Sequence, residues 1–275
     1  MITQPEHLTI LAPNAVATSS TGLCLVIDGG RDIVYAIRDD SILVFQFGGL
    51  GQGQGQFNRA AALVVDNAGS IYVCDQGNYR VQKFDARGNF LLSFGERGSG
   101  AAQFDSPSGI AIDAFGYVFV TDAGNNRVQR FTAEGRFISQ FGEFGWGPGF
   151  LNRPAGIAVG PDNDVYLSDA GNHRIKQYDT EGRFIAASSE LALISGIAID
   201  KSGAVYHIDT RENRLKYYRS LYKDSKTTDG ALGYDVSDRS QMAFSKNEDK
   251  LYICDPEPRK LMVYRTVSGE LKSGR

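Results

Sequence analysis

Residues 109–141 read GIAIDAFGYVFVTDAGNNRVQRFTAEGRFISQF, and this stretch decides the fold. It contains four short apolar, β-branched or aromatic runs, at 109–113, 117–121, 127–131 and 137–141. Short segments rich in Gly, Asn, Asp and Glu separate the runs. Runs of this composition, broken by turn-forming residues, are typical of strands joined by hairpins. The stretch therefore predicts one four-stranded antiparallel sheet.

The same unit recurs along the chain at a spacing of 47 residues. The columns that keep this spacing are Asp28, Asp75, Asp122 and Asp169; Phe84, Phe131 and Tyr178; Gly88, Gly135 and Gly182; and Phe47-Gly48, Phe94-Gly95 and Phe141-Gly142. Asp209 and Asp255 mark two further units with altered spacing, each followed nine residues later by a tyrosine. Six units of four strands, with a period in the forties, indicate a β-propeller. A (β/α)₈ barrel would need helices between the strands, and the sequence has no such pattern.

We therefore predict an all-β, six-bladed β-propeller of four-stranded antiparallel blades, forming a single domain over residues 1–275. The expected blades are approximately 13–48, 60–95, 107–142, 154–188, 194–235 and 240–275, with inner strands near Val16, Leu63, Ile110, Ile157, Ile197 and Ala243. Two strands are ambiguous. The last outer strand comes either from GELKSG (269–274) or from EHLTIL (6–11), and the fourth strand of blade five is placed at LGYDV (232–236).

Composition sets bounds on function. The chain is 42% hydrophobic and 22% charged with a net charge of −3, so it is globular and has no global basic field for nucleic acid. No apolar run approaches the ~20 residues that span a bilayer. Residues 1–10 resemble no signal peptide, so we expect a cytoplasmic location, or a periplasmic or extracellular one if the chain is trimmed. Cys24, Cys74 and Cys254 are expected to be free thiols.

The glycine-rich stretch FGGLGQGQGQFNRA (47–60) raises the possibility of a phosphate-binding loop. Its counterparts, GERGSGAAQ (95–103) and GEFGWGPGF (142–150), place their glycines differently, and a strand follows each one. A phosphate cradle needs defined glycines that open a helix. We interpret these segments as connectors between blades, and we expect no cofactor.

Repeated polar residues flank the predicted turns. The pairs are Asp75/Arg80, Asp122/Arg127, Asp169/Arg174, Asp209/Arg214 and Asp255/Lys260. Residues so placed face each other across a hairpin, so we expect opposite-charge cross-strand pairs with a structural role. Asn58, Asp105 and Asn152 could hold a cation near the axis, although Asx residues in this context more often bond their own backbone in a turn.

Three segments carry a pattern that resembles the NHL repeat, D-x-x-N-x-R-[VI]-x-x-[FY]: DQGNYRVQKF (75–84), DAGNNRVQRF (122–131) and DAGNHRIKQY (169–178). Residues 209–218 (DTRENRLKYY) resemble it with Glu212 in the Asn position, and residues 255–264 lack the Asn as well. The resemblance implies a six-bladed propeller and three classes of function. These are a protein-binding platform, an RNA-binding domain with a basic face, and a metal enzyme similar to the amidating lyase or, more distantly, to gluconolactonase-like propellers.

The residues favour the first class. The three histidines, His7, His173 and His207, occupy different repeat columns and do not converge as metal ligands, and we expect His207 to be packed in the fold. Charges on the face that would bind RNA nearly cancel: Arg31, Arg59, Arg97, Arg153, Arg211 and Arg259 stand beside Asp32, Glu96, Glu143, Glu212 and Glu257. We interpret the chain as a non-catalytic interaction or scaffold module that binds a protein partner, as part of a larger assembly. The metal-dependent lyase or lactonase is the alternative, and RNA binding is third.

Features that break the repeat are the candidates for specificity. The only tryptophan, Trp146, stands beside Phe144 in a connector. Propeller topology places the connectors and the turns between second and third strands on one face. The residues expected to bind the partner there are Trp146, Phe144, Arg153, Tyr79, His173 and Arg211. The polar segment 219–241 breaks the repeat as well.

Overall fold

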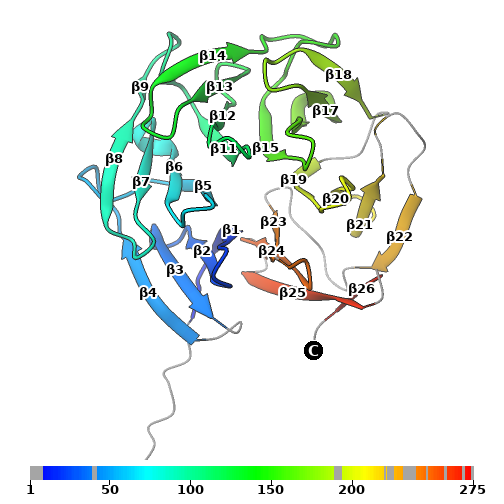
Figure 1. The fold of residues 1–275 in the computed structure, drawn as a ribbon, viewed down its shortest axis with the longest axis horizontal. Coiled ribbons are helices and arrows are strands. Elements are labelled where there is room, and N and C mark those ends of the chain that lie inside the picture. Colours follow the sequence, from blue (N-terminus) through cyan, green and yellow to red (C-terminus); the bar gives the residue numbers. More distant parts are fainter. Residues whose placement is uncertain are drawn as a thin grey trace, which may run out of the picture.

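In the computed structural model, six four-stranded antiparallel sheets stand around a central axis (Figure 1). The structure describes residues 9–38, 42–188, 194–219, 221, 226–231, 240–245, 247–256, 259–267 and 270–273. Each blade is one contiguous stretch of chain whose strands run in order from the axis to the rim. The predicted six-bladed all-β propeller is confirmed.

The first three blades lie between residues 13 and 141. Blade one consists of β1 (Pro13–Thr18), β2 (Cys24–Asp28), β3 (Ile33–Arg38) and β4 (Ile42–Gly48). Blade two consists of β5 (Ala60–Val65), β6 (Ile71–Asp75), the 3₁₀ turn η1 (Gln76–Asn78), β7 (Arg80–Phe84) and β8 (Phe90–Phe94). The short strands β9 (Glu96–Arg97) and β10 (Gln103–Phe104) pair in parallel within the next connector. Blade three consists of β11 (Pro107–Ile112), β12 (Val118–Asp122), β13 (Arg127–Phe131) and β14 (Phe137–Phe141).

The remaining blades complete the ring. Blade four consists of β15 (Pro154–Val159), β16 (Val165–Asp169), η2 (Ala170–Asn172), β17 (Arg174–Tyr178) and β18 (Phe184–Ala187). Blade five consists of β19 (Ile194–Ile199), β20 (Val205–Asp209), β21 (Arg214–Tyr218) and β22 (Lys226–Ala231). Blade six consists of β23 (Gln241–Phe244), β24 (Lys250–Asp255), β25 (Lys260–Val267) and β26 (Glu270–Ser273). All six predicted inner-strand positions lie in inner strands.

The two ambiguous strands are resolved by the pairing. The last outer strand is β26, from the C-terminal candidate, and it pairs with β25. The fourth strand of blade five is β22 at 226–231, so its placement at LGYDV was wrong; residues 232–236 lie outside the described residues. Blade one lies against blade six because β1 packs on β23 and β24, and within the described residues the two sheets share no strand.

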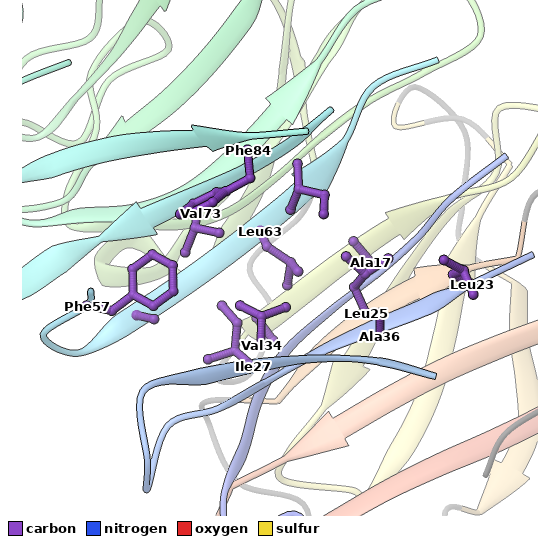
Figure 2. Close-up of a cluster of buried hydrophobic side chains, with 13 residues drawn as sticks. Ala17, Leu23, Leu25, Ile27, Val34, Ala36, Phe57, Leu63, Val73 and Phe84 are labelled. Atoms are coloured by element: carbon purple, nitrogen blue, oxygen red, sulfur yellow. The ribbon is translucent and has the colours of Figure 1, made fainter. Parts of the chain in front are cut away.

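The core consists of apolar layers between neighbouring blades. Between blades one and two, Ile27 and Val34 face Leu63, Val73 and Phe84 (Figure 2). The repeated aromatic column belongs to these layers: the Phe84 ring centroid lies 4.6 Å from that of Phe47 and 5.6 Å from that of Phe57. Equivalent aromatic contacts join Phe94 to Phe131 and Phe141 to Tyr178. The aromatic residue therefore recurs from unit to unit because it packs one blade on the next.

The axis is apolar. A cavity of about 270 Å³ lies between the inner strands of all six blades. Apart from Thr18 and Gln241, the side chains of its lining residues are apolar, and they include Val16, Leu63, Ile110, Ile157 and Ile197 among others. The described residues that line it include no His, Asp or Glu.

The connectors are compact loops. Isolated parallel β-bridges join Leu50 to Phe57 and Phe144 to Leu151 in two of the connectors. In the third, the short strands β9 and β10 pair in parallel. Gly95 has a φ of +102°, and a Cβ there would lie 2.6 Å from the Phe104 ring, so this corner requires glycine. The 47–60 segment forms no helix, as the connector interpretation expects. Within the described residues, we find no helix long and apolar enough to cross a membrane.

Candidate interaction face

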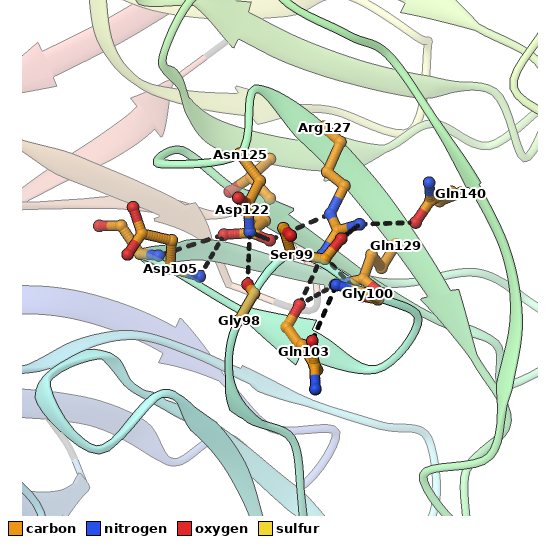
Figure 3. Close-up of polar contacts among 12 residues, drawn as sticks. Gly98, Ser99, Gly100, Gln103, Asp105, Asp122, Asn125, Arg127, Gln129 and Gln140 are labelled. Carbon is orange, nitrogen blue, oxygen red and sulfur yellow. Dashed lines mark hydrogen bonds and ion pairs between the residues drawn. The ribbon is translucent and has the colours of Figure 1, made fainter.

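We call the surface formed by the connectors and by the turns between second and third strands the connector face. Beneath it, the repeated Asp ties three segments together, as Figure 3 shows for blade three. Oδ1 of the buried Asp122 accepts hydrogen bonds from the backbone N–H groups of Asp105 (3.0 Å) and Ser106 (3.1 Å). Its Oδ2 accepts from Asn125 Nδ2 at 2.7 Å and from Arg127 Nε at 3.1 Å.

Asn125 and Arg127 also fasten the preceding connector. The Asn125 amide donates to Gly98 O at 2.9 Å. The Arg127 guanidinium donates to the carbonyl oxygens of Ser99, Gly100 and Gln103 (Figure 3). Blade two repeats this arrangement with Asp75, Asn78 and Arg80. The Asn and Arg of the repeat therefore hold the glycine-rich connector by its carbonyl groups.

Two of the predicted ion pairs differ in the structure. Asp169 faces Arg174 and Asp209 faces Arg214 across their hairpins, as expected. The ion pairs, however, are Asp169 Oδ2 to Lys176 Nζ at 2.9 Å and Asp209 Oδ2 to Lys216 Nζ at 2.6 Å. Each Lys lies seven residues after the Asp, where blades two and three have Gln82 and Gln129. Sequence analysis missed this exchange, although the change from Gln to Lys within one repeat column was a visible signal.

Blade one departs from the repeat as its sequence suggested. Asp28 accepts backbone N–H bonds from Leu11 (2.9 Å) and Ala12 (3.1 Å), and its partner Arg31 is 3.6 Å away within the turn. Asp32, also in the turn, accepts a bond from the N–H of Ala60 in blade two at 2.9 Å. Both carboxylates therefore accept hydrogen bonds from backbone N–H groups.

The most exposed aromatic group on the connector face is in the connector before blade four. Trp146 is 69% exposed and Phe144 is 57% exposed, and their rings meet edge to face with centroids 5.2 Å apart. Phe150, which sequence analysis did not single out, is also exposed. Asn172 in the neighbouring turn donates to Gly145 O at 2.8 Å, which places His173 beside this connector.

The other predicted binding residues are distributed over the connector face. Tyr79 and His173 occupy equivalent left-handed positions, with φ of 57° and 54°, at the ends of η1 and η2. Arg97 lies over the Tyr79 ring at 5.2 Å. Arg153 is exposed, and its N–H donates to Asn126 Oδ1 of blade three. Arg211 is exposed in the turn of blade five. The structure thus groups Phe144, Trp146 and His173 on blade four and leaves Tyr79 and Arg211 on blades two and five.

The three weak metal candidates lie against the turn glycines of their own blades. A Cβ on Gly77, Gly124 or Gly171 would contact the side chains of Asn58, Asp105 and Asn152 respectively. Asn152 also donates to Gly171 O at 3.2 Å. No group of three or more His, Cys, Asp or Glu side chains suited to a metal ion occurs in the described part of the chain.

His207 is packed inside the fold. It is buried and stacks on Tyr218, with ring centroids 5.4 Å apart, and Tyr218 belongs to the apolar layer between blades four and five. Neither ring nitrogen has a hydrogen-bond partner. Burial disfavours the imidazolium and lowers the pKa of His207 to about 4. The expectation that this residue is structural agrees with its surroundings.

Comparisons with known proteins agree with the repeat pattern. The NHL repeat family model matches residues 57–84, 104–131 and 151–178. Each match runs from the end of a connector to the aromatic residue that closes a third strand. No curated protein matches the chain in sequence.

Similar solved structures include two lyases and a lactonase. An inactive virginiamycin B lyase from Staphylococcus aureus with quinupristin has a TM-score of 0.70 and 14% identity, over 98% of this chain and 87% of that one. A streptogramin B lyase has a TM-score of 0.68 and 16% identity, over 95% and 86%. A gluconolactonase from Xanthomonas campestris has a TM-score of 0.69 and 16% identity, over 97% and 88%. At these identities the likeness concerns the fold alone. With three matched repeats and six blades, the chain is an NHL-repeat β-propeller.

Proposed function

We propose that this propeller is a non-catalytic interaction module that binds a protein partner on its connector face. The observation that carries the proposal is the pair of exposed, touching aromatic rings of Phe144 and Trp146. Large aromatic side chains supply much of the energy at protein interfaces, and exposing them without a partner is unfavourable. Arg153 and His173 give the same region polar neighbours, as an interface rim requires.

A metal-dependent lyase or lactonase is the second candidate, because the similar structures include such enzymes. Catalytic propellers of the kind considered in the sequence analysis need His, Asp, Glu or Asn side chains around the axis. The side chains that line the cavity on this axis are mostly apolar, with no His, Asp or Glu among the described residues. This chemistry offers a metal ion few ligands and favours the interaction module.

The test compares single variants of exposed aromatic residues on opposite faces. Tagged protein is cross-linked to its partner in cells, the partner is identified and purified, and its affinity is then measured with each variant. Trp146→Ala should weaken binding by about a hundredfold, as expected for an interface hot spot. Phe115→Ala is the matched control, because Phe115 is 74% exposed in the β11–β12 turn on the other face. Equal affinities for wild type and Trp146→Ala would refute the assignment of this face.

A further inference from the structure

We propose that Lys176 is a positioning residue that makes the connector 143–150 a preformed apolar projection, fitted to a protein partner with an apolar pocket. The inference rests on the proposed function for the partner, but its first test needs only the purified chain. Lys176 is 1% exposed although it carries a charge. Its ammonium contacts Asp169 at 2.9 Å, Gly147 O at 2.9 Å and the carbonyl oxygen of Phe150.

Blades two and three hold their connectors differently. Gln82 donates to Gln56 O and accepts from Gly55 N at 3.0 Å. Gln129 donates to Gln103 O and accepts from Ala102 N at 2.9 Å. A glutamine amide thus binds one carbonyl and one N–H group of the connector. Lysine has three donors and no acceptor, so it can bind only carbonyl groups.

In the connector before blade four, Lys176 binds carbonyl groups only, those of Gly147 and Phe150. Gly149 stands in the repeat column of Gly55 and Ala102, and the Lys176 ammonium has no acceptor for its N–H. The carbonyl of Pro148, between these groups, accepts from Tyr178 Oη at 3.4 Å. Gly145 O accepts from Asn172, and Glu143 O accepts from the Leu151 N–H. Most connector carbonyls are therefore hydrogen-bonded within the chain, and the aromatic side chains of Phe144, Trp146 and Phe150 are exposed to solvent.

This geometry indicates the kind of partner. A partner that adds a strand needs main-chain acceptors, and most of those in this connector are already bonded within the chain. The connector instead presents exposed aromatic rings on a backbone that the buried Lys176–Asp169 ion pair holds by its carbonyl groups. Such a cluster binds by insertion into an apolar pocket, and its rigidity lowers the entropy cost of association.

Trp146 is the only tryptophan, so intrinsic fluorescence reports on this connector. In Lys176→Gln, which copies the residue type of Gln82, we expect lower Trp anisotropy and faster acrylamide quenching, with far-UV circular dichroism unchanged. Arg174→Gln is the matched control, because Arg174 lies on the same strand and its loss removes the same charge while leaving the bonds from Lys176 to the connector in place. Unchanged anisotropy and quenching in Lys176→Gln would overturn the positioning role, whatever the partner does.

The second measurement uses the purified partner. Its addition should shift Trp146 emission to shorter wavelength, because the indole enters an apolar pocket. Lys176→Gln should bind about tenfold more weakly than Arg174→Gln, through lost rigidity. Emission that does not shift on binding would refute the pocket. The proposed function fails separately from the role of Lys176: it is refuted if Trp146→Ala binds the partner with normal affinity.

Discussion

At the scale of single residues, Asp122 has the clearest structural role, because its buried carboxylate is the acceptor for two backbone N–H groups and two side chains. Asp122→Ala leaves the buried Arg127 without its counter-charge. Breaking a buried pair in this way costs about 3–5 kcal/mol of unfolding free energy. Urea denaturation should show this loss, while partner affinity of the folded protein stays the same.

The control for this substitution is Asp105→Ala. Asp105 is exposed, and its backbone N–H rather than its carboxylate bonds Asp122, so its loss should cost less than about 0.5 kcal/mol. If Asp122→Ala had wild-type stability and no partner binding, the repeated turn Asp would contribute to partner binding instead of to the stability of the fold.

His207 predicts a pH dependence of stability. The pKa of an unfolded histidine is about 6.5, and the pKa in the fold is about 4. As the pH falls below 6.5, the unfolded chain takes up a proton before the folded chain does, so stability is lost between pH 6.5 and 4. The loss is on the order of 3 kcal/mol, given about 1.4 kcal/mol for each pKa unit.

The charged groups that act on His207 are Asp209, which favours its protonation, and Lys216, which opposes it. His207→Leu takes the residue type of Leu167 in the same repeat column and removes the titration. Thermal melts from pH 7 to pH 4 should show a shallower decline for His207→Leu than for wild type. Parallel declines would mean that His207 does not contribute.

At the scale of elements, some connector glycines are required for the backbone conformation of their loop and others are not. Gly95 has a positive φ and no room for a Cβ, so Gly95→Ala should lower the unfolding free energy by about 1–3 kcal/mol. A Cβ on Gly149 would meet nothing within 4 Å. Gly149→Ala should therefore change stability by no more than about 0.5 kcal/mol. Differential scanning calorimetry of both variants tests the contrast, which a similar loss in each would contradict.

Sequence periodicity predicted the inner strands and the turn Asp because both recur once per blade. It failed where a blade departs from the repeat. The ion pairs of Asp169 and Asp209 were assigned to Arg174 and Arg214, which face them across the hairpins, while the structure pairs them with Lys176 and Lys216 two residues further on. Trp146 and Phe144 could be named from the sequence as exceptions, but their contact and the bonds that orient them depend on blade-to-connector packing.

At the scale of the whole molecule, the mostly apolar side chains around the axis predict independence from metal ions. Dialysis against a chelator should leave the melting temperature and partner affinity unchanged, because the described residues that line the axis include no His, Asp or Glu and the interblade layers are apolar. Elemental analysis of the purified protein before and after dialysis is the matching measurement. Stoichiometric calcium or zinc, with a lower melting temperature after its removal, would instead support the enzyme alternative.

In the part of the chain that the structure describes, blades six and one meet without a shared strand, and this has a consequence for biosynthesis. Each sheet is complete once its own stretch of about one repeat has left the ribosome, so pairing can follow the order of translation. The strand pairing of blade one uses only β1 to β4, so it does not depend on the final residues. The last event is then the apposition of two finished sheets, which is a docking of side chains rather than the threading of a strand. A stalled nascent chain would hence already contain intact blades.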